Sequence, residues 1–78
     1  MDFGTKIRAM RAIRRRSQIE LADITGVPNF TLSLIENGRM LPTENTERAI
    51  RIALDWTDEI DAHLNAIGEL SAEPANGQ

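Results

Sequence analysis

The sequence predicts an all-α protein with five helices. Apolar residues recur every three or four positions along most of the chain, which is the spacing of one face of an α-helix. Helix-capping residues and glycines separate these stretches, and no segment alternates between apolar and polar residues as a half-buried strand does. The 78 residues, 41% hydrophobic and 27% charged, suffice for one folded domain and are too few for two.

The first helix is predicted at residues 3–15 and the second at residues 18–25. Ser17, followed three residues later by Glu20, forms the pattern of a capping box, which marks the start of the second helix. Gly26 then provides a residue that readily takes the left-handed conformation in which many helices end. The apolar face of the first helix consists of residues at helical spacing: Phe3, Ile7 and Met10. Its polar side carries Lys6, Arg8 and Arg15.

Three further helices are predicted at residues 28–37, 44–54 and 58–70. Pro28 is placed at a favoured first helical position, and Thr43 and Thr57 can cap the last two helices. The domain is therefore expected to comprise residues 1–70. Residues 71–78 include proline and glycine but no large apolar residue, so we expect a flexible tail.

Composition argues against several classes of protein. The chain contains no cysteine, which excludes disulfides, thiolate zinc sites and cysteine nucleophiles. No apolar run approaches the roughly 20 residues of a membrane span, and the first residues do not resemble a secretory signal, so we expect a cytoplasmic protein without a membrane partner. The single histidine, His63, and scattered carboxylates do not have catalytic or metal-ligand spacing. We expect no enzyme activity, no cofactor and no metal.

The charges are distributed unevenly along the chain. Residues 1–51 contain all nine Lys and Arg and six acids, a net charge of +3, whereas residues 52–78 contain the other six acids, −6. Such an asymmetry can place positive potential on one face of a protein whose overall charge is −3. An ordinary solvated surface explains the acids equally well.

The segment from Ser17 to Pro42 resembles the helix-turn-helix of the XRE family, the phage Cro and CI-type repressors. The matching features are Gln18, Leu21-Ala22, Gly26-Val27, Ile35-Glu36-Asn37-Gly38-Arg39 and Pro42, together with Ile7, Arg11, Ile50 and Leu54. The match covers about residues 4–56. It implies a five-helix, lambda-repressor-like DNA-binding domain whose second and third helices form the helix-turn-helix.

The third helix is the candidate reader of DNA bases. A helix of about ten residues fits the major groove when a second helix holds it across the backbone. The resemblance assigns base-reading positions to Asn29, Phe30, Thr31, Ser33 and Leu34. Asn29 can bind adenine through its amide, or it is simply a helix-start residue. Phe30 can pack on a thymine methyl or in a protein interface, and Leu34 is similarly ambiguous.

Phosphate contacts are assigned to polar residues around the motif. The resemblance places Gln18, Asn37 and Arg39 at positions that bind phosphate, and the basic cluster before the motif can reach the backbone as well. That cluster consists of Arg14, Arg15 and Arg16. The alternative for these arginines is an interaction with the dipole of their own helix. Arg11 and Glu36 match positions that form a mostly buried salt bridge in relatives, an architectural pair.

These features predict a sequence-specific double-stranded DNA-binding regulator, a repressor that binds a palindromic operator as a homodimer. Its context can be a phage repressor, a restriction-modification controller or an antitoxin. The candidate dimer interface lies on the fourth and fifth helices: Ile52, Trp56, Ile60, Leu64 and Ile67. The alternative for Trp56 and the Ile60 stripe is that they cover the protein's own core. A second hypothesis is a protein-binding adaptor or antitoxin with the same fold, which Phe30, Leu34 and the acidic second half favour.

Overall fold

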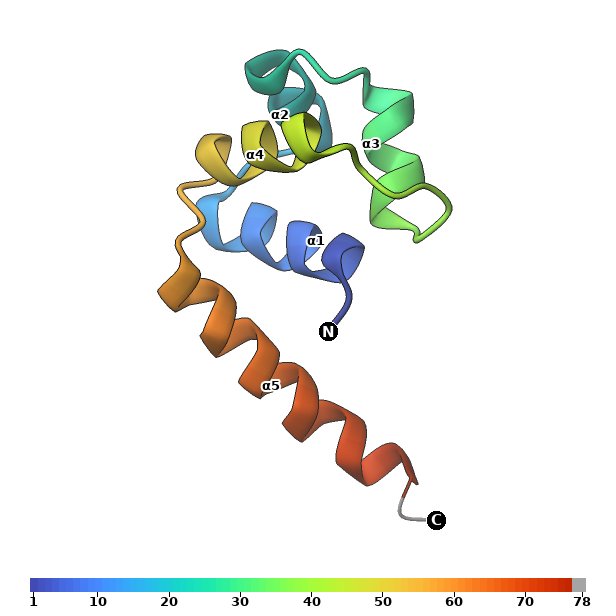
Figure 1. The fold of residues 1–78 in the computed structure, drawn as a ribbon, viewed down its shortest axis with the longest axis vertical. Coiled ribbons are helices and arrows are strands. Elements are labelled where there is room, and N and C mark those ends of the chain that lie inside the picture. Colours follow the sequence, from blue (N-terminus) through green and yellow to red (C-terminus); the bar gives the residue numbers. More distant parts are fainter. Residues whose placement is uncertain (77–78) are drawn as a thin grey trace.

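The protein is all-helical over the residues that its computed structural model describes, 1–76, with side chains described through Leu70. Five helices follow one another along the chain (Figure 1). They are α1 (Phe3–Arg14), α2 (Gln18–Thr25), α3 (Asn29–Glu36), α4 (Glu44–Ala53) and α5 (Asp58–Asn76). The described part contains no strand, so the all-α prediction is confirmed. Within it, no helix combines the length and the apolar composition needed to cross a membrane.

Side-chain caps fix where the helices begin. The Ser17 hydroxyl accepts from the Glu20 N–H at 3.0 Å, and the Glu20 carboxylate accepts from the Ser17 N–H at 2.8 Å. This is the predicted capping box of α2. Thr43 caps α4 and Thr57 caps the start of α5, each by accepting a backbone N–H three residues on at 3.1 Å. Asp2, to which the sequence analysis gave no role, caps α1.

Helix boundaries differ from the predicted ones by one residue in α1, α3 and α4. α1 ends before Arg15, which lies in the left-handed region at φ 56°. Pro28 precedes α3 as its N-cap because its ψ of 142° is extended, rather than occupying the first helical turn. α3 ends at Glu36, and α4 ends at Ala53.

α5 ends at Asn76 rather than at residue 70, so its backbone extends through most of the segment predicted to be a tail. Ser71, Ala72 and Glu73 follow directly on the predicted end at Leu70 and contain no helix-breaking residue, and the helix also includes Pro74. A helix that already exists elongates by one hydrogen bond per residue, which is far easier than nucleation. Residues 77 and 78 lie outside the described part.

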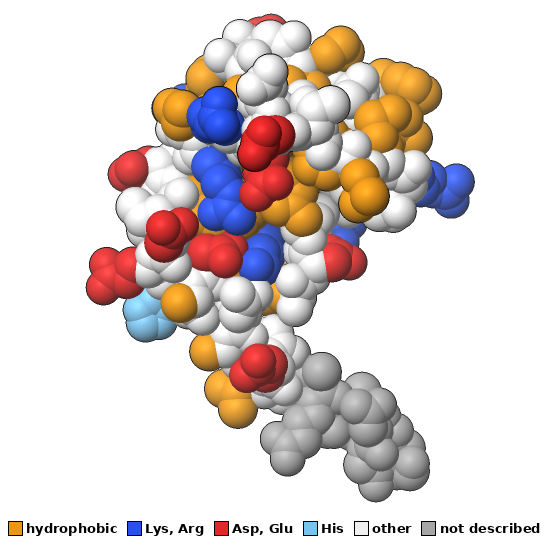
Figure 2. All heavy atoms as spheres, in the orientation of Figure 1, with side chains coloured by type: hydrophobic (Ala, Val, Ile, Leu, Met, Phe, Trp, Pro, Cys, Tyr) orange, Lys and Arg blue, Asp and Glu red, His pale blue; other side chains and the backbone are white. Residues whose placement is uncertain are grey.

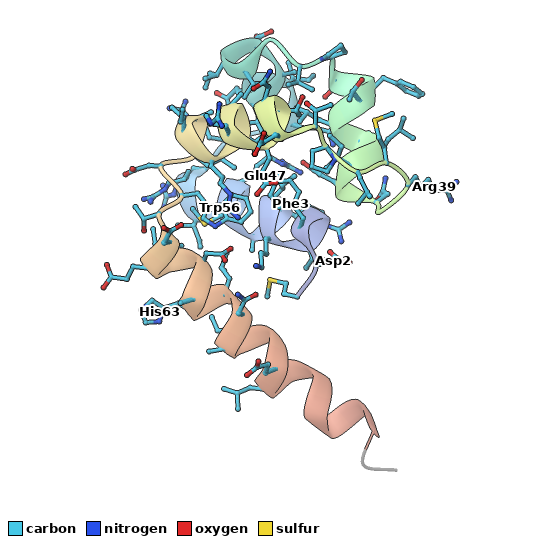
Figure 3. All side chains as sticks on the ribbon, viewed as in Figure 1. Asp2, Phe3, Arg39, Glu47, Trp56 and His63 are labelled. Carbon is cyan, nitrogen blue, oxygen red and sulfur yellow. The ribbon has the colours of Figure 1, made fainter. Side chains whose placement is uncertain are left out.

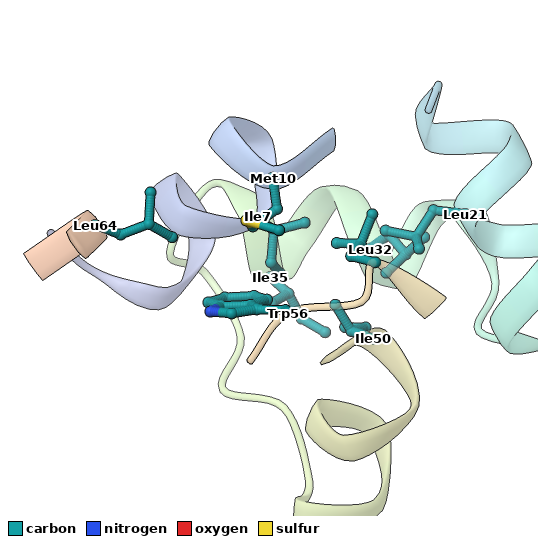
Figure 4. Packing of buried hydrophobic residues seen from close by; sticks show 9 residues of the cluster. Ile7, Met10, Leu21, Leu32, Ile35, Ile50, Trp56 and Leu64 are labelled. Atoms are coloured by element: carbon teal, nitrogen blue, oxygen red, sulfur yellow. The ribbon is translucent and has the colours of Figure 1, made fainter. Parts of the chain in front are cut away.

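One hydrophobic core joins all five helices (Figure 4). Its buried members are Ile7, Met10, Leu21, Leu32, Ile35, Ile50, Leu54, Trp56 and Leu64. α3 packs against α1 and α2, and α2 also packs against α4. Gly4 allows the close approach of α1 to α3, since a Cβ there would lie 2.5 Å from the carbonyl oxygens of Ile35 and Glu36. Only glycine fits this contact without a shift of backbone.

A polar and aromatic cluster attaches α5 to the remainder of the domain. The Lys6 ammonium donates to Asp61 Oδ1 at 2.9 Å, and the Trp56 indole N–H donates to the same oxygen at 3.2 Å. Trp56 stacks on Phe3 with ring centroids 5.3 Å apart, and the Arg51 guanidinium lies 4.6 Å from the Trp56 ring (Figure 3). Lys6, expected on the polar side of the first helix, is in fact only 9% exposed. Beyond this cluster, α5 extends away from the other helices (Figure 1).

Candidate nucleic-acid interface

α3 presents one face to solvent while the opposite face lies in the core. Leu32 and Ile35 are buried, whereas Asn29 and Phe30 are exposed. The side chain of Phe30 is 73% exposed, an unusual position for an aromatic residue. The remaining predicted base-reading residues are half-buried: Thr31, Ser33 and Leu34. All five predicted base-reading residues are therefore accessible to some degree.

This face contains no exposed acid. Between Asp23 and Glu44 the only acid is Glu36, which is 4% exposed and paired with Arg11. Hydrophobic side chains gather over α3 and the loop after it, at the upper right of Figure 2, while acids gather toward α4 and α5. A polyanion approaching α3 thus meets no repulsive carboxylate on this helix.

Basic residues lie beside the α3 face. Arg39 is exposed in the loop after α3 and projects outward (Figure 3). Arg8, which the sequence analysis did not select, is exposed on α1 and donates to Asn37 Oδ1 at 3.5 Å. Arg15 and Arg16 are exposed at the end of α1, just before α2. Arg8 precedes Arg11 by three residues and thus shares its side of α1, a spacing that could have identified it.

Arg14 requires a correction, because it is engaged elsewhere. Its Nε donates to the Leu54 carbonyl at 2.8 Å and its Nη2 to the Asp55 carbonyl at 2.9 Å. These carbonyls lie at the C-cap of α4 and one residue beyond it, where helix carbonyls have no partner within their own helix, and this guanidinium satisfies them. We therefore leave Arg14 out of the candidate interface.

Arg11, Glu36 and Gln18 join the ends of three helices. Arg11 Nε and Nη2 donate to the two carboxylate oxygens of Glu36 at 2.8 and 2.9 Å, the bidentate form of the predicted pair. Gln18, predicted to bind phosphate, donates its amide to Glu36 Oε1 at 3.2 Å and is half-buried. Glu36 thereby fixes α1 and the start of α2 relative to α3. No buried side-chain nitrogen or oxygen in the described residues is left without a partner.

The predicted dimer interface is corrected for three of its five residues. Trp56 and Leu64 are 5% and 4% exposed and belong to the core, and Ile60 packs against that core. The stripe on α5 therefore covers the protein's own interior near Phe3 and Lys6. Ile52 and Ile67 remain accessible, with 72% and 52% of their surface exposed.

The α3 face has the chemistry of a binding surface. It offers one amide, two hydroxyls and two apolar side chains on a rigid helix, with exposed arginines close by. Comparison of the chain with protein-family models, with curated proteins and with solved structures finds no match. Function is therefore inferred from the residues and their arrangement.

Proposed function

We propose that this protein is a sequence-specific regulator of transcription that binds double-stranded DNA through a lambda-repressor-like helix-turn-helix. The motif consists of α2, the turn at residues 26–28 and α3. The observation that supports it best is the solvent-facing side of α3, which lacks any exposed acid and is bordered by the exposed Arg39. The phosphates of DNA attract a surface of this charge, and the major groove can accept the side chains of α3.

The dimensions of the motif suit this role. An α-helix with its side chains is about 10 to 12 Å across and the major groove is about 12 Å wide, so α3, with eight residues, can enter it. Its N-terminal residues, including Asn29, would contact base edges. α2 would cross the DNA backbone next to α3, and the hydrogen bonds that Gln18 and Arg11 make to Glu36 would hold the two helices in place.

Phosphate contacts are proposed for residues around α3 and the start of α2. Arg39 and Asn37 follow α3, Arg15 and Arg16 precede α2, and Gln18 begins it. These contacts would set the register of the protein on the duplex without reading its sequence. We add Arg8 because its guanidinium lies beside Asn37.

The proposed regulator is a repressor that acts as a homodimer. One domain of 78 residues covers little DNA, and two copies on an inverted repeat with half-sites about one helical turn apart would gain affinity and specificity. Ile52 and Ile67 are the predicted interface residues that remain exposed, so one or both would lie between the copies. Sedimentation of the wild type should reveal a dimer, and Ile52→Asp or Ile67→Asp should shift it to monomer. A wild type that is monomeric at micromolar concentration contradicts the homodimer.

Selection of binding sites from random duplexes tests the function, and it should be repeated at two salt concentrations because salt governs phosphate binding. The expected result is an inverted repeat, with Arg39→Ala recovering the same sequence at lower affinity. Asn29→Ala should relax selection at one base position. Unselective binding at both salt concentrations contradicts the proposal and favours the second candidate, a protein-binding adaptor, for which the exposed Phe30 and Leu41 would form the contact surface.

A further inference from the structure

The solvent-facing side of α3 is unusually apolar for a surface that is to read hydrogen-bonding base edges. Phe30 is 73% exposed, and Leu34 follows it by four residues, on the same side of the helix. Met40 and Leu41, in the loop after α3, are 41% and 90% exposed. The side-chain hydrogen-bonding groups on the solvent-facing side of α3 are limited to one amide and two short hydroxyls, since the Glu36 carboxylate is buried.

The major groove offers one apolar group to such a surface. Thymine projects its C5 methyl there, whereas cytosine has only a hydrogen at this position and the remaining groups that mark each base pair are hydrogen-bond donors and acceptors. Burying Phe30 against a donor or acceptor would leave that group without a partner, which costs free energy. A methyl group carries no such cost. The occupant that fits Phe30 and Leu34 within a groove is therefore a pyrimidine that bears a C5 methyl.

Charge favours DNA over a protein surface as the occupant of this face. Neither α3 nor the loops on either side of it, residues 26–43, contain an exposed acid, and the exposed Arg39 and Arg8 lie nearby. Phosphates therefore complement the surroundings of the apolar side chains. Asn29 and Thr31 flank Phe30 in sequence and supply hydrogen-bonding groups that a wholly apolar docking face would not need.

We propose that Phe30 and Leu34 determine specificity by packing against the C5 methyl groups of pyrimidines, so that the protein discriminates thymine from uracil in duplex DNA. This inference rests on the proposed function. In this proposal, contacts with methyl groups determine most of the preference for particular bases, and Asn29 is the main residue that hydrogen-bonds to a base. Each methyl contact that is lost should weaken binding about fourfold, the equivalent of one buried methyl or methylene group.

Deoxyuridine substitution tests this directly, because it removes only the methyl group and keeps base pairing. Thymines of the duplex recovered by site selection are replaced one at a time, and affinities are measured for the wild type and for Phe30→Ala. Wild-type protein should lose about fourfold at one or more thymines of each half-site, and Phe30→Ala should show less than twofold loss at those it contacts. This comparison cancels any effect of uracil on the duplex itself. Phe30→Leu should retain part of the sensitivity, since it keeps an apolar contact.

Two further variants test whether the sensitivity to the thymine methyl group depends on particular α3 side chains or on any exposed apolar side chain. Leu34→Ala should lose sensitivity at thymines other than those assigned to Phe30. Ile13→Ala, which removes an apolar side chain that is 57% exposed on α1, should keep the wild-type pattern. Thermal unfolding should be unchanged in Phe30→Ala because that side chain is mostly exposed.

The outcomes distinguish the inference from the function on which it rests. A selected site whose affinity does not change with uracil, or changes equally in the wild type and in both α3 variants, overturns the methyl contacts and leaves the proposed DNA binding intact. Failure to select any site removes the proposed function, and the methyl contacts with it. In that case Phe30→Ala should instead weaken a protein complex.

Discussion

Removal of Arg11 should destabilise the domain far more than removal of a neighbouring arginine. Glu36 is 4% exposed and accepts three hydrogen bonds, two of them from Arg11. Arg11→Ala leaves this carboxylate with only the Gln18 amide. Breaking a buried ion pair by removing one partner typically costs about 3 to 5 kcal/mol, because the remaining charge stays buried. Arg11 keeps 20% of its side chain exposed, so water can partly replace it and the lower end, about 3 kcal/mol, is expected.

This cost is large for a protein of 78 residues, whose net stability is expected to be roughly 4 to 12 kcal/mol. At about 4 to 8 °C per kcal/mol, the melting temperature should fall by roughly 12 to 24 °C. The assay is thermal unfolding followed by circular dichroism, with urea unfolding to obtain the free energy at one temperature.

The matched control is Arg8→Ala, one helical turn earlier on α1. Arg8 is exposed and its two side-chain hydrogen bonds are 3.5 Å long, so its loss should change stability by no more than about 0.5 kcal/mol. The double variant Arg11→Met with Glu36→Leu should recover most of the stability, since it buries no unpaired charge. The reasoning is refuted if Arg11→Ala melts within a few degrees of Arg8→Ala.

Three further predictions follow from the packing and the charges. Gly4→Ala should destabilise by about 1 to 3 kcal/mol, as measured by urea unfolding, because its Cβ would lie 2.5 Å from backbone carbonyl oxygens of α3. The Cβ of Gly68→Ala would lie 2.8 Å from the backbone nitrogen and the Cβ of Met1, and this variant should cost less because only the terminal residue has to shift. Burial alone would raise the pKa of Asp61, but hydrogen bonds from Lys6 and Trp56 hold that pKa below its ordinary value. The contribution of Asp61 to the free energy of unfolding is therefore present above about pH 4 and is lost as the pH falls further. Asp61→Asn should be less stable than the wild type at neutral pH and lose less stability on acidification, as reported by fluorescence of the single tryptophan. Arg39→Ala should weaken binding to all duplexes and reduce the dependence of log K on log salt by about one, whereas Arg48→Ala, exposed on α4, should change neither quantity.

Local signals in the sequence predicted most of the helices. The capping box at Ser17 and Glu20, the threonine cap at Thr43 and the glycine at position 26 act within a few residues of themselves, so their effect is visible without the fold. The end of α5 was missed because the prediction ended the helix where the large apolar residues stop and where proline and glycine follow, whereas the backbone of α5 continues to Asn76. The helix continues past Leu70, where the apolar pattern ends.

Contacts distant in sequence were harder to predict. Arg14 was assigned to phosphate, but it bonds carbonyls 40 and 41 residues later, which no local pattern indicates. Lys6 was assigned to the polar side of α1, and its partner Asp61 lies 55 residues away. The spacing of Trp56 in the sequence is compatible with a dimer interface and with the core, and only its packing against Phe3 shows that it belongs to the core. The Arg11–Glu36 pair was predictable because the family resemblance supplied the long-range partner.

The most direct test of the central claim is a nuclear magnetic resonance titration of the ¹⁵N-labelled protein with a duplex recovered by site selection, with a scrambled duplex as control. The account predicts that the largest shifts of backbone amides lie in α3, in the following loop at Gly38 and Arg39, and at the start of α2 around Gln18, with smaller shifts for the scrambled duplex. Shifts concentrated on α4 or α5, or none at saturating duplex, would contradict the claim that α3 is the surface that reads DNA.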